Sequence, residues 1–374
     1  MIKQERLVEE FMELVKVDSE TGHEEEISIV LKKKFSELGL NVVEDDSKPR
    51  TGHGAGNLIV TMEGTPGSKA PKLFFTCHMD TVTPGKGIKP SLGKDGWITS
   101  DGTTILGSDD KAGIAVLFEA IRVIQEQQIE HGQIQFVITV GEESGLLGAR
   151  AMDPKYLDAD FGYAIDSNGE IGAIAVAAPT QAKIKMKIFG KSAHAGVNPE
   201  DGISAIQVAS KAISRMKLGR LDHETTANIG KFAGGGPTNV VCDFVEVDAE
   251  ARSIVQDKVE RQIEHMREAL ESAASECGAK CEFIGEIVYP AFNFDENDEV
   301  VKLAQRAIAK IGLTSRTFHS GGGSDANIFN GMGVPTVNLA LGYENIHTTK
   351  ERIRAVDMAK AAEMVISIIG ETVK

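Results

Sequence analysis

The chain has 374 residues and a formal charge of −15, with 41% hydrophobic and 25% charged residues, so its length predicts about two domains and its apolar content excludes global disorder. The acidic balance argues against nucleic-acid binding, and no apolar run is long enough for a membrane span. Four cysteines in a chain this long make no disulfide framework, and the N-terminus lacks a signal-peptide pattern, so we expect a cytoplasmic enzyme.

The first part of the chain predicts helices that alternate with strands. Leu7, Phe11 and Leu14 recur at helical spacing, and Thr21 can cap a second helix that ends at Gly39. A further helix runs from Lys111 to about Gln128. The order predicts an α/β fold with a mixed, mostly parallel sheet covered by helices. The expected strands are residues 57–62, 72–77, 133–140 and 161–166.

The middle of the chain follows another pattern, β-α-β-β-α-β, which is typical of a ferredoxin-like α+β domain. After it, a helix at 297–311, a strand at 334–341 and a last helix at 357–370 return to the first pattern. We therefore expect a discontinuous catalytic domain over 1–178 and 291–374, with an inserted lid or dimerisation domain over 179–290. The expected elements of the insert are a strand at 183–190, a helix at 201–216, strands at 226–232 and 240–250, a helix at 257–276 and a strand at 280–289.

Acidic residues follow directly on three of the predicted strands, and two more precede the helix at Lys111. In open α/β sheets, ligands bind at the carboxyl ends of the strands, so residues distant in sequence meet at one edge. The residues expected at that edge are His78, Asp80, Asp109, Asp110, Glu142, Glu143 and Asp166.

Six carboxylates and one imidazole packed together would repel strongly unless cations bound them. Two divalent metals would use all of these ligands, and the mixture of His and carboxylate favours zinc, manganese or cobalt over calcium or magnesium. In His78-x-Asp80 both side chains point the same way on an extended segment, so Asp80 is placed to accept the second imidazole N–H of His78. A single acidic pair is more commonly a helix cap or a solvated loop. The metal hypothesis therefore depends on several such segments occurring together.

The adjacent pair Glu142 and Glu143 indicates a division of roles. One carboxylate can bind metal while the other acts as a base towards water, which is the arrangement of metallohydrolases.

Four segments together, FFTCHMDTVTPG, ILGSDDKAGIA, GEESGLLGA and AIDSNG, resemble the metallopeptidase superfamily of carboxypeptidase G, acetylornithine deacetylase and peptidase T. The resemblance covers most of the chain and is closest to the peptidase T branch. It implies two divalent metal ions per chain, with zinc expected and cobalt or manganese as alternatives. The resemblance implies that His78 and Asp166 hold one metal, that Glu143 and His347 hold the other, and that Asp109 bridges both. It implies that Glu142 is the general base and then the proton donor, and that Asp80 orients His78. It also implies that the Asp109–Asp110 peptide is cis.

The resemblance also assigns substrate contacts. His194 matches the lid histidine that stabilises the oxyanion, often from the partner subunit of a dimer, although by itself it could equally be an ordinary loop residue. Asn239 and Arg252 match positions that bind the substrate's backbone and carboxylate, and a salt bridge to a nearby acid is the plainer reading of Arg252. Gly322 and Gly323, in SGGGSDAN, match a loop that lines the substrate pocket.

The resulting hypothesis is an exopeptidase that binds a small peptide, removes the N-terminal residue of tripeptides and forms a homodimer through its lid. One alternative is an N-acyl-amino-acid deacylase of the same superfamily, although Asp166 favours the peptidases because deacylating members commonly have Glu there. A second alternative is a non-catalytic peptide-binding protein with the same fold. The chain is somewhat shorter than typical tripeptidases of the family, so preference for peptide length stays open.

Overall fold

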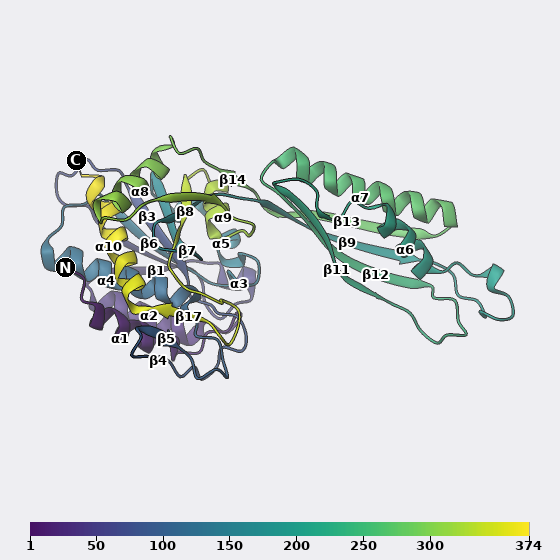
Figure 1. Ribbon diagram of the computed structural model, residues 1–374, viewed down its shortest axis with the longest axis horizontal. Coiled ribbons are helices and arrows are strands. Elements are labelled where there is room, and N and C mark those ends of the chain that lie inside the picture. Colours follow the sequence, from purple (N-terminus) through teal and green to yellow (C-terminus); the bar gives the residue numbers. More distant parts are fainter. Residues whose placement is uncertain (374) are drawn as a thin grey trace. The chain divides into compact units, whose positions relative to one another are not determined.

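The computed structural model describes residues 1–373, which divide into two compact units (Figure 1). The first unit comprises Met1–Ala177, Phe294–Ser320 and the described chain from Ser324 onwards. The second unit comprises Ala178–Asn293 together with the three glycines Gly321–Gly323. Each unit has a hydrophobic core of its own.

The first unit is built on a mixed sheet with a parallel centre. In the order β1-β2-β6-β3-β7-β16-β8, the pairs β6-β3, β3-β7 and β7-β16 are parallel, while β1-β2, β2-β6 and β16-β8 are antiparallel; β15 pairs with β8 in parallel. The carboxyl ends of the four central strands therefore meet at one edge. The strands are β1 (Asn41–Glu44), β2 (Leu58–Met62), β3 (Leu73–His78), β6 (Ile134–Thr139), β7 (Phe161–Ser167), β8 (Ala173–Ala178), β15 (Arg316–His319) and β16 (Thr336–Ala340).

Helices cover both faces of this sheet. Neighbouring residues of β3 point to opposite faces, so each face can be followed through one of its side chains. Phe75 stacks with Phe136 and Tyr163 on the face that α4 covers, whereas the ring of Phe74 lies 4.9 Å from that of Phe329 in α9. The layer of helices that includes α4 consists of α1 (Gln4–Val15), α4 (Ser108–Gln127), α8 (Glu299–Lys310) and α10 (Ala355–Glu371). The remaining elements are α2 (Glu25–Glu37), α3 (Lys48–Thr51), α5 (Leu147–Ala151), the 3-10 turn Pro154–Tyr156, α9 (Asp325–Gly331), and a small sheet of β4 (Ser91–Leu92), β5 (Trp97–Thr99) and β17 (Arg352–Arg354).

The second unit is an antiparallel sheet in the order β10-β11-β12-β9-β13, with α6 and α7 packed together over one face. The inward residues of β9 alternate with lysines, because only one face of that strand is buried. This β-α-β-β-α-β arrangement is ferredoxin-like. Its elements are β9 (Thr180–Phe189), the 3-10 turn Pro199–Asp201, α6 (Ala205–Arg215), β10 (Gly219–Arg220), β11 (Thr225–Gly234), β12 (Phe244–Ser253), α7 (Gln256–Cys277) and β13 (Lys280–Tyr289). The residues of the unit also include the short strand β14 (Phe292–Asn293), which is not part of this five-stranded sheet.

Several local predictions were wrong. Thr21 does not cap α2: the helix starts after Glu24, and the Thr21 hydroxyl donates to Asp80 instead. The strand expected at 240–250 begins only at Phe244, since Val240 forms an isolated bridge with His194. Strands β1 and β8 were not predicted.

Among the described residues, none of the helices has the length and apolar character of a membrane span.

Candidate metal centre

The carboxyl ends of the parallel strands bring the predicted acidic residues together. His78 ends β3, Asp166 lies near the end of β7, and the Glu142–Glu143 turn follows β6. Asp109 lies in the first turn of α4, and His347 lies in the loop after β16. Since β6, β3, β7 and β16 are neighbours, the sheet order itself produces this convergence.

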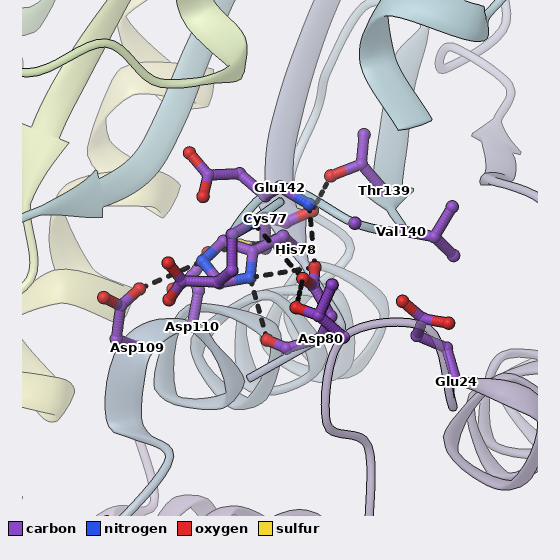
Figure 2. A network of polar contacts seen from close by, with 12 residues as sticks. Glu24, Cys77, His78, Asp80, Asp109, Asp110, Thr139, Val140 and Glu142 are labelled. Carbon is purple, nitrogen blue, oxygen red and sulfur yellow. Dashed lines mark hydrogen bonds and ion pairs between the residues drawn. The ribbon is translucent and has the colours of Figure 1, made fainter. Parts of the chain in front are cut away.

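Asp109 lies between two histidines (Figure 2 shows its contact with His78). Its Oδ1 is 3.0 Å from His78 Nε2, and its Oδ2 is 3.2 Å from His347 Nε2. His78 Nε2 is also 3.8 Å from Asp166 Oδ1, and His347 Nε2 is 2.9 Å from Glu143 Oε1. The two oxygens of Asp109 therefore belong to two adjacent donor groups, one with Asp166 and one with Glu143.

The electrostatics of this cluster favour bound cations. Burial, and then the charge of Asp109, raise the pKa of the Asp166 carboxyl well above its ordinary value. Hydrogen bonds with Asp109 and Glu143 raise the pKa of the His347 imidazole to about 10. The carboxylates of this cluster supply negative charge and oxygen donors, and the two imidazoles supply nitrogen donors, which together suit a divalent metal.

The donor set fits two ions. The ligand atoms of His78, Asp109 and Asp166 lie within 4.8 Å of one another, and so do those of Asp109, Glu143 and His347. Glu142 also forms such a group with His78 and Glu143, so the distances alone do not exclude it as a ligand. Each histidine presents Nε2, and the carboxylate shared by both sets is that of Asp109.

Asp80 holds the Glu142–Glu143 turn rather than the imidazole alone. Its carboxylate accepts hydrogen bonds from the backbone N–H groups of Glu142 at 3.0 Å and Glu143 at 3.2 Å, and from the Thr21 hydroxyl at 2.6 Å. His78 Nδ1 lies 3.0 Å from the backbone carbonyl of Asp80 and 3.5 Å from its carboxylate. The Asp80 main chain therefore makes the shorter contact to the His78 ring, and the Asp80 carboxylate lies at ion-pair distance from the same nitrogen.

Glu142 lies beside this cluster, where its carboxylate is close to His78 and Glu143. Burial, and then the nearby charges of Asp166, Asp325 and Glu143, raise the pKa of the Glu142 carboxyl well above its ordinary value. The Asp109–Asp110 peptide is cis, as the resemblance implied, and the Asp110 carboxylate accepts the N–H of His78 at 3.3 Å.

The structure also shows supporting residues that the sequence did not reveal. The Tyr343 hydroxyl donates to Asp166 Oδ1 at 3.0 Å. The Asn338 side-chain amide accepts the backbone N–H of Asp166 and donates to the backbone carbonyl of Asp166. Glu351 binds the backbone of the loop before Asp109. Tyr343 and Glu351 flank His347 in one short segment, but no local pattern distinguishes either from an exposed loop residue.

The second unit contains the remaining predicted residues. His194 and Asn239 lie on adjacent segments, because His194 bridges Val240 and the Ala195 N–H donates to the Asn239 carbonyl at 2.9 Å. Both are exposed. Arg252, near the end of β12, pairs with Glu250 at 2.9 Å, as the plainer reading expected.

The glycines of the SGGGSDAN segment differ in their surroundings. A Cβ on Gly323 would lie 2.4 Å from the ring of Tyr289, so glycine is needed there for packing within the second unit. A Cβ on Gly322 would meet nothing within 4 Å. The close-approach requirement is thus seen at Gly323, and towards a tyrosine.

Comparisons with known proteins agree on one group. Residues 74–371 match the sequence profile of Peptidase family M20/M25/M40. A crystal structure of the aminopeptidase PepT from Bacillus cereus is 58% identical to this chain, with a TM-score of 0.95 and 100% of each chain covered. A tripeptidase structure from Staphylococcus aureus is 52% identical, with a TM-score of 0.96 over 100% of this chain and 99% of that chain. Peptidase T of Clostridium perfringens is 29% identical over 414 residues, covering 96% of this chain and 97% of the relative.

Proposed function

Because this chain belongs to peptidase family M20/M25/M40, we propose that it is a two-metal aminopeptidase that removes the N-terminal residue of tripeptides. The observation that carries the proposal is the Asp109 carboxylate, which faces His78 with one oxygen and His347 with the other. Similarity to an aminopeptidase and to a tripeptidase, each more than half identical to this chain, supports the choice of reaction.

The proposed ligands form two sets that share one carboxylate. His78 and Asp166 would hold one ion, Glu143 and His347 would hold the other, and Asp109 would contribute an oxygen to each set. When bound, two divalent ions of zinc, cobalt or manganese polarise the scissile carbonyl and lower the pKa of water.

Glu142 is the proposed general base. Its carboxylate takes a proton from the attacking water and returns that proton to the amine that leaves. Asp80 contributes by holding the N–H groups of Glu142 and Glu143, so the base and a ligand are fixed by the same side chain. The Asp166 carboxylate accepts a hydrogen bond from the Tyr343 hydroxyl.

Substrate recognition is proposed for the second unit. His194 stabilises the oxyanion, Asn239 and Arg252 bind the peptide backbone and carboxylate, and the loop with Gly322 and Gly323 lines the pocket. A planar guanidinium such as that of Arg252 can hold a carboxylate with two hydrogen bonds. We further propose that the enzyme is cytoplasmic and forms a homodimer through this unit.

A peptide series followed by mass spectrometry tests the reaction. The metal-loaded protein is given Leu-Gly, Leu-Gly-Gly, Leu-Gly-Gly-Gly, N-acetyl-Leu-Gly-Gly and N-acetyl-leucine. The expected result is release of leucine from the unblocked tripeptide and no cleavage of the N-acetylated tripeptide. The difference is expected because an aminopeptidase requires a free N-terminal amino group.

The other outcomes identify the alternatives. Hydrolysis of N-acetyl-leucine in preference to every peptide would make the protein a deacylase. Binding of Leu-Gly-Gly without cleavage, in protein that holds two metals, would make it a peptide-binding protein.

A further inference from the structure

Glu351 is a buried acid that the proposed reaction does not use. It lies between His347 and β17, and 2% of its surface is exposed. Its Oε2 accepts the N–H groups of Leu106 at 2.8 Å and Gly107 at 2.9 Å. Its Oε1 accepts the Ser108 hydroxyl at 2.6 Å and the Asp109 N–H at 3.1 Å. One carboxylate thus binds four consecutive residues.

These contacts hold the segment that leads into helix α4, where the N-cap residue Gly107 has no side-chain cap and Asp109 and Asp110 depart from helical φ/ψ. The first N–H groups of a helix lack partners within the helix, and an acceptor with a negative charge is favourable there. The Glu351 carboxylate, 242 positions away from Asp109 in sequence, supplies that acceptor. A helix-capping role alone would account for these hydrogen bonds.

Glu351 also connects two parts of the candidate metal centre. At one end, Glu351 fixes the backbone of Asp109, the residue whose carboxylate faces both histidines. At the other end, Glu351 closes the turn that directly follows His347, since the Glu351 N–H donates to the Thr348 carbonyl at 3.1 Å. Glu351 therefore connects the Asp109 loop to the turn that follows His347.

We propose that Glu351 is a positioning residue that sets the separation of Asp109 and His347, and so determines the affinity of the two-metal site. The proposal rests on the two-metal function proposed above. Replacing a residue that orients a metal ligand commonly lowers metal affinity or activity by about 10–100-fold.

The substitution E351Q is the informative one because it preserves size. The amide keeps one oxygen acceptor, but its NH2 group faces donors that were bound to the second carboxylate oxygen, so about half of the contacts are lost. E351D keeps both oxygens on a side chain one methylene shorter, and should recover part of the loss.

Two control variants separate positioning from other effects. E344Q removes an acidic charge from the same loop at a residue whose carboxylate pairs with Arg352 and does not contact Asp109. I121V removes a buried methyl from the interior of α4 and destabilises the helix's packing away from the site.

The experiment titrates Co²⁺ into metal-free protein and follows the visible absorption, with kcat and KM measured afterwards at saturating metal. We expect wild type, E344Q and I121V to bind two Co²⁺ with equal affinity. E351Q should bind Co²⁺ roughly 10–100-fold more weakly, with an altered absorption spectrum and a lower kcat at unchanged KM.

Two outcomes decide against different statements. If E351Q binds two Co²⁺ with wild-type affinity and spectrum, and loses only thermal stability as I121V does, Glu351 is a helix cap alone and the inference is wrong. If the wild-type protein itself binds no Co²⁺, the proposed function fails instead.

Discussion

The Asp80 carboxylate and the backbone N–H of Glu142 lie 3.0 Å apart, joined by a hydrogen bond. The same carboxylate also accepts the N–H of Glu143 and the hydroxyl of Thr21. Since Asp80 is fully buried, these donors and the His78 imidazole stabilise its charge. The turn that presents the proposed base is therefore fixed to the residues that follow β3.

Replacing Glu142 with Gln should remove turnover and leave metal binding intact. The amide keeps the shape of the side chain but cannot accept a proton, and loss of a general base lowers kcat by about 10²–10⁴-fold. The measurement is Leu-Gly-Gly hydrolysis together with metal analysis of the same sample. Glu143→Gln is the contrasting variant and should lose metal. Activity near the wild-type level in metal-loaded Glu142→Gln would remove Glu142 from its proposed role.

Replacing Thr21 with Val should lower kcat without lowering metal affinity. The substitution removes a hydrogen bond to the buried Asp80 charge, worth about 1.5 kcal/mol, which is roughly tenfold in rate if it is lost in the transition state. Thr103→Val is the matched control, because its hydroxyl binds Asp101 in an exposed loop. Equal kcat values for the two variants would show that Thr21 has no influence on the site.

Chelation of the metals should lower thermal stability. Ions that bind only the folded state stabilise it by about 4 kcal/mol per site when free metal exceeds Kd by about 1,000-fold. The denaturation temperature, measured with and without chelator, should fall by several degrees and recover on addition of Zn²⁺. Asp166→Asn should respond less than wild type because one set of ligands is incomplete. An unchanged denaturation temperature in the wild-type protein would contradict a resident metal centre.

Lys111 predicts a pH dependence of stability in the metal-free protein. Burial lowers the pKa of its ammonium group to about 7, and its Nζ donates to the Val17 carbonyl at 2.6 Å. The folded protein therefore holds this proton less tightly than the unfolded chain, whose lysine pKa is about 10.4. The stability from this group is complete above the unfolded pKa and is lost as the pH falls towards 7.

The change between pH 9.5 and 7 should be on the order of 3 kcal/mol. It is measured as the difference between wild type and Lys111→Met in urea unfolding at both pH values, with the exposed Lys94→Met as control. The advantage of Lys111→Met over wild type should be larger at pH 7. A difference that does not vary with pH would mean that Lys111 titrates normally.

Mixing two inactive variants tests whether His194 acts across a dimer. A hybrid of His194→Ala and Glu142→Ala subunits contains one site in which both residues are intact if His194 comes from the partner copy. With random pairing, about a quarter of wild-type activity should return in the co-expressed mixture. A mixture that stays inactive, or a monomeric protein in light scattering, would show that His194 acts on its own subunit or not at all.

The acidic edge of the sheet could be predicted because its evidence is local. His78 and Asp80, the Glu142–Glu143 pair and Asp166 each follow a strongly apolar strand, and the parallel order of such strands brings their ends together. The ferredoxin-like insert was predictable for the same reason, since each of its elements shows its own periodicity. His347 had no comparable local signal and was identified through resemblance alone.

Thr21 and Glu351 show what the sequence could not reveal. Thr21 looks like a helix cap, and Glu351 is one of 55 acidic residues in an acidic chain. Their partners lie 59 and 242 positions away, at Asp80 and Asp109. Apolar periodicity and the order of the strands are properties of short segments, so the sequence by itself determined the fold class and the acidic edge. Which buried carboxylate finds which donor depends on how distant segments pack, and only the tertiary structure decided that.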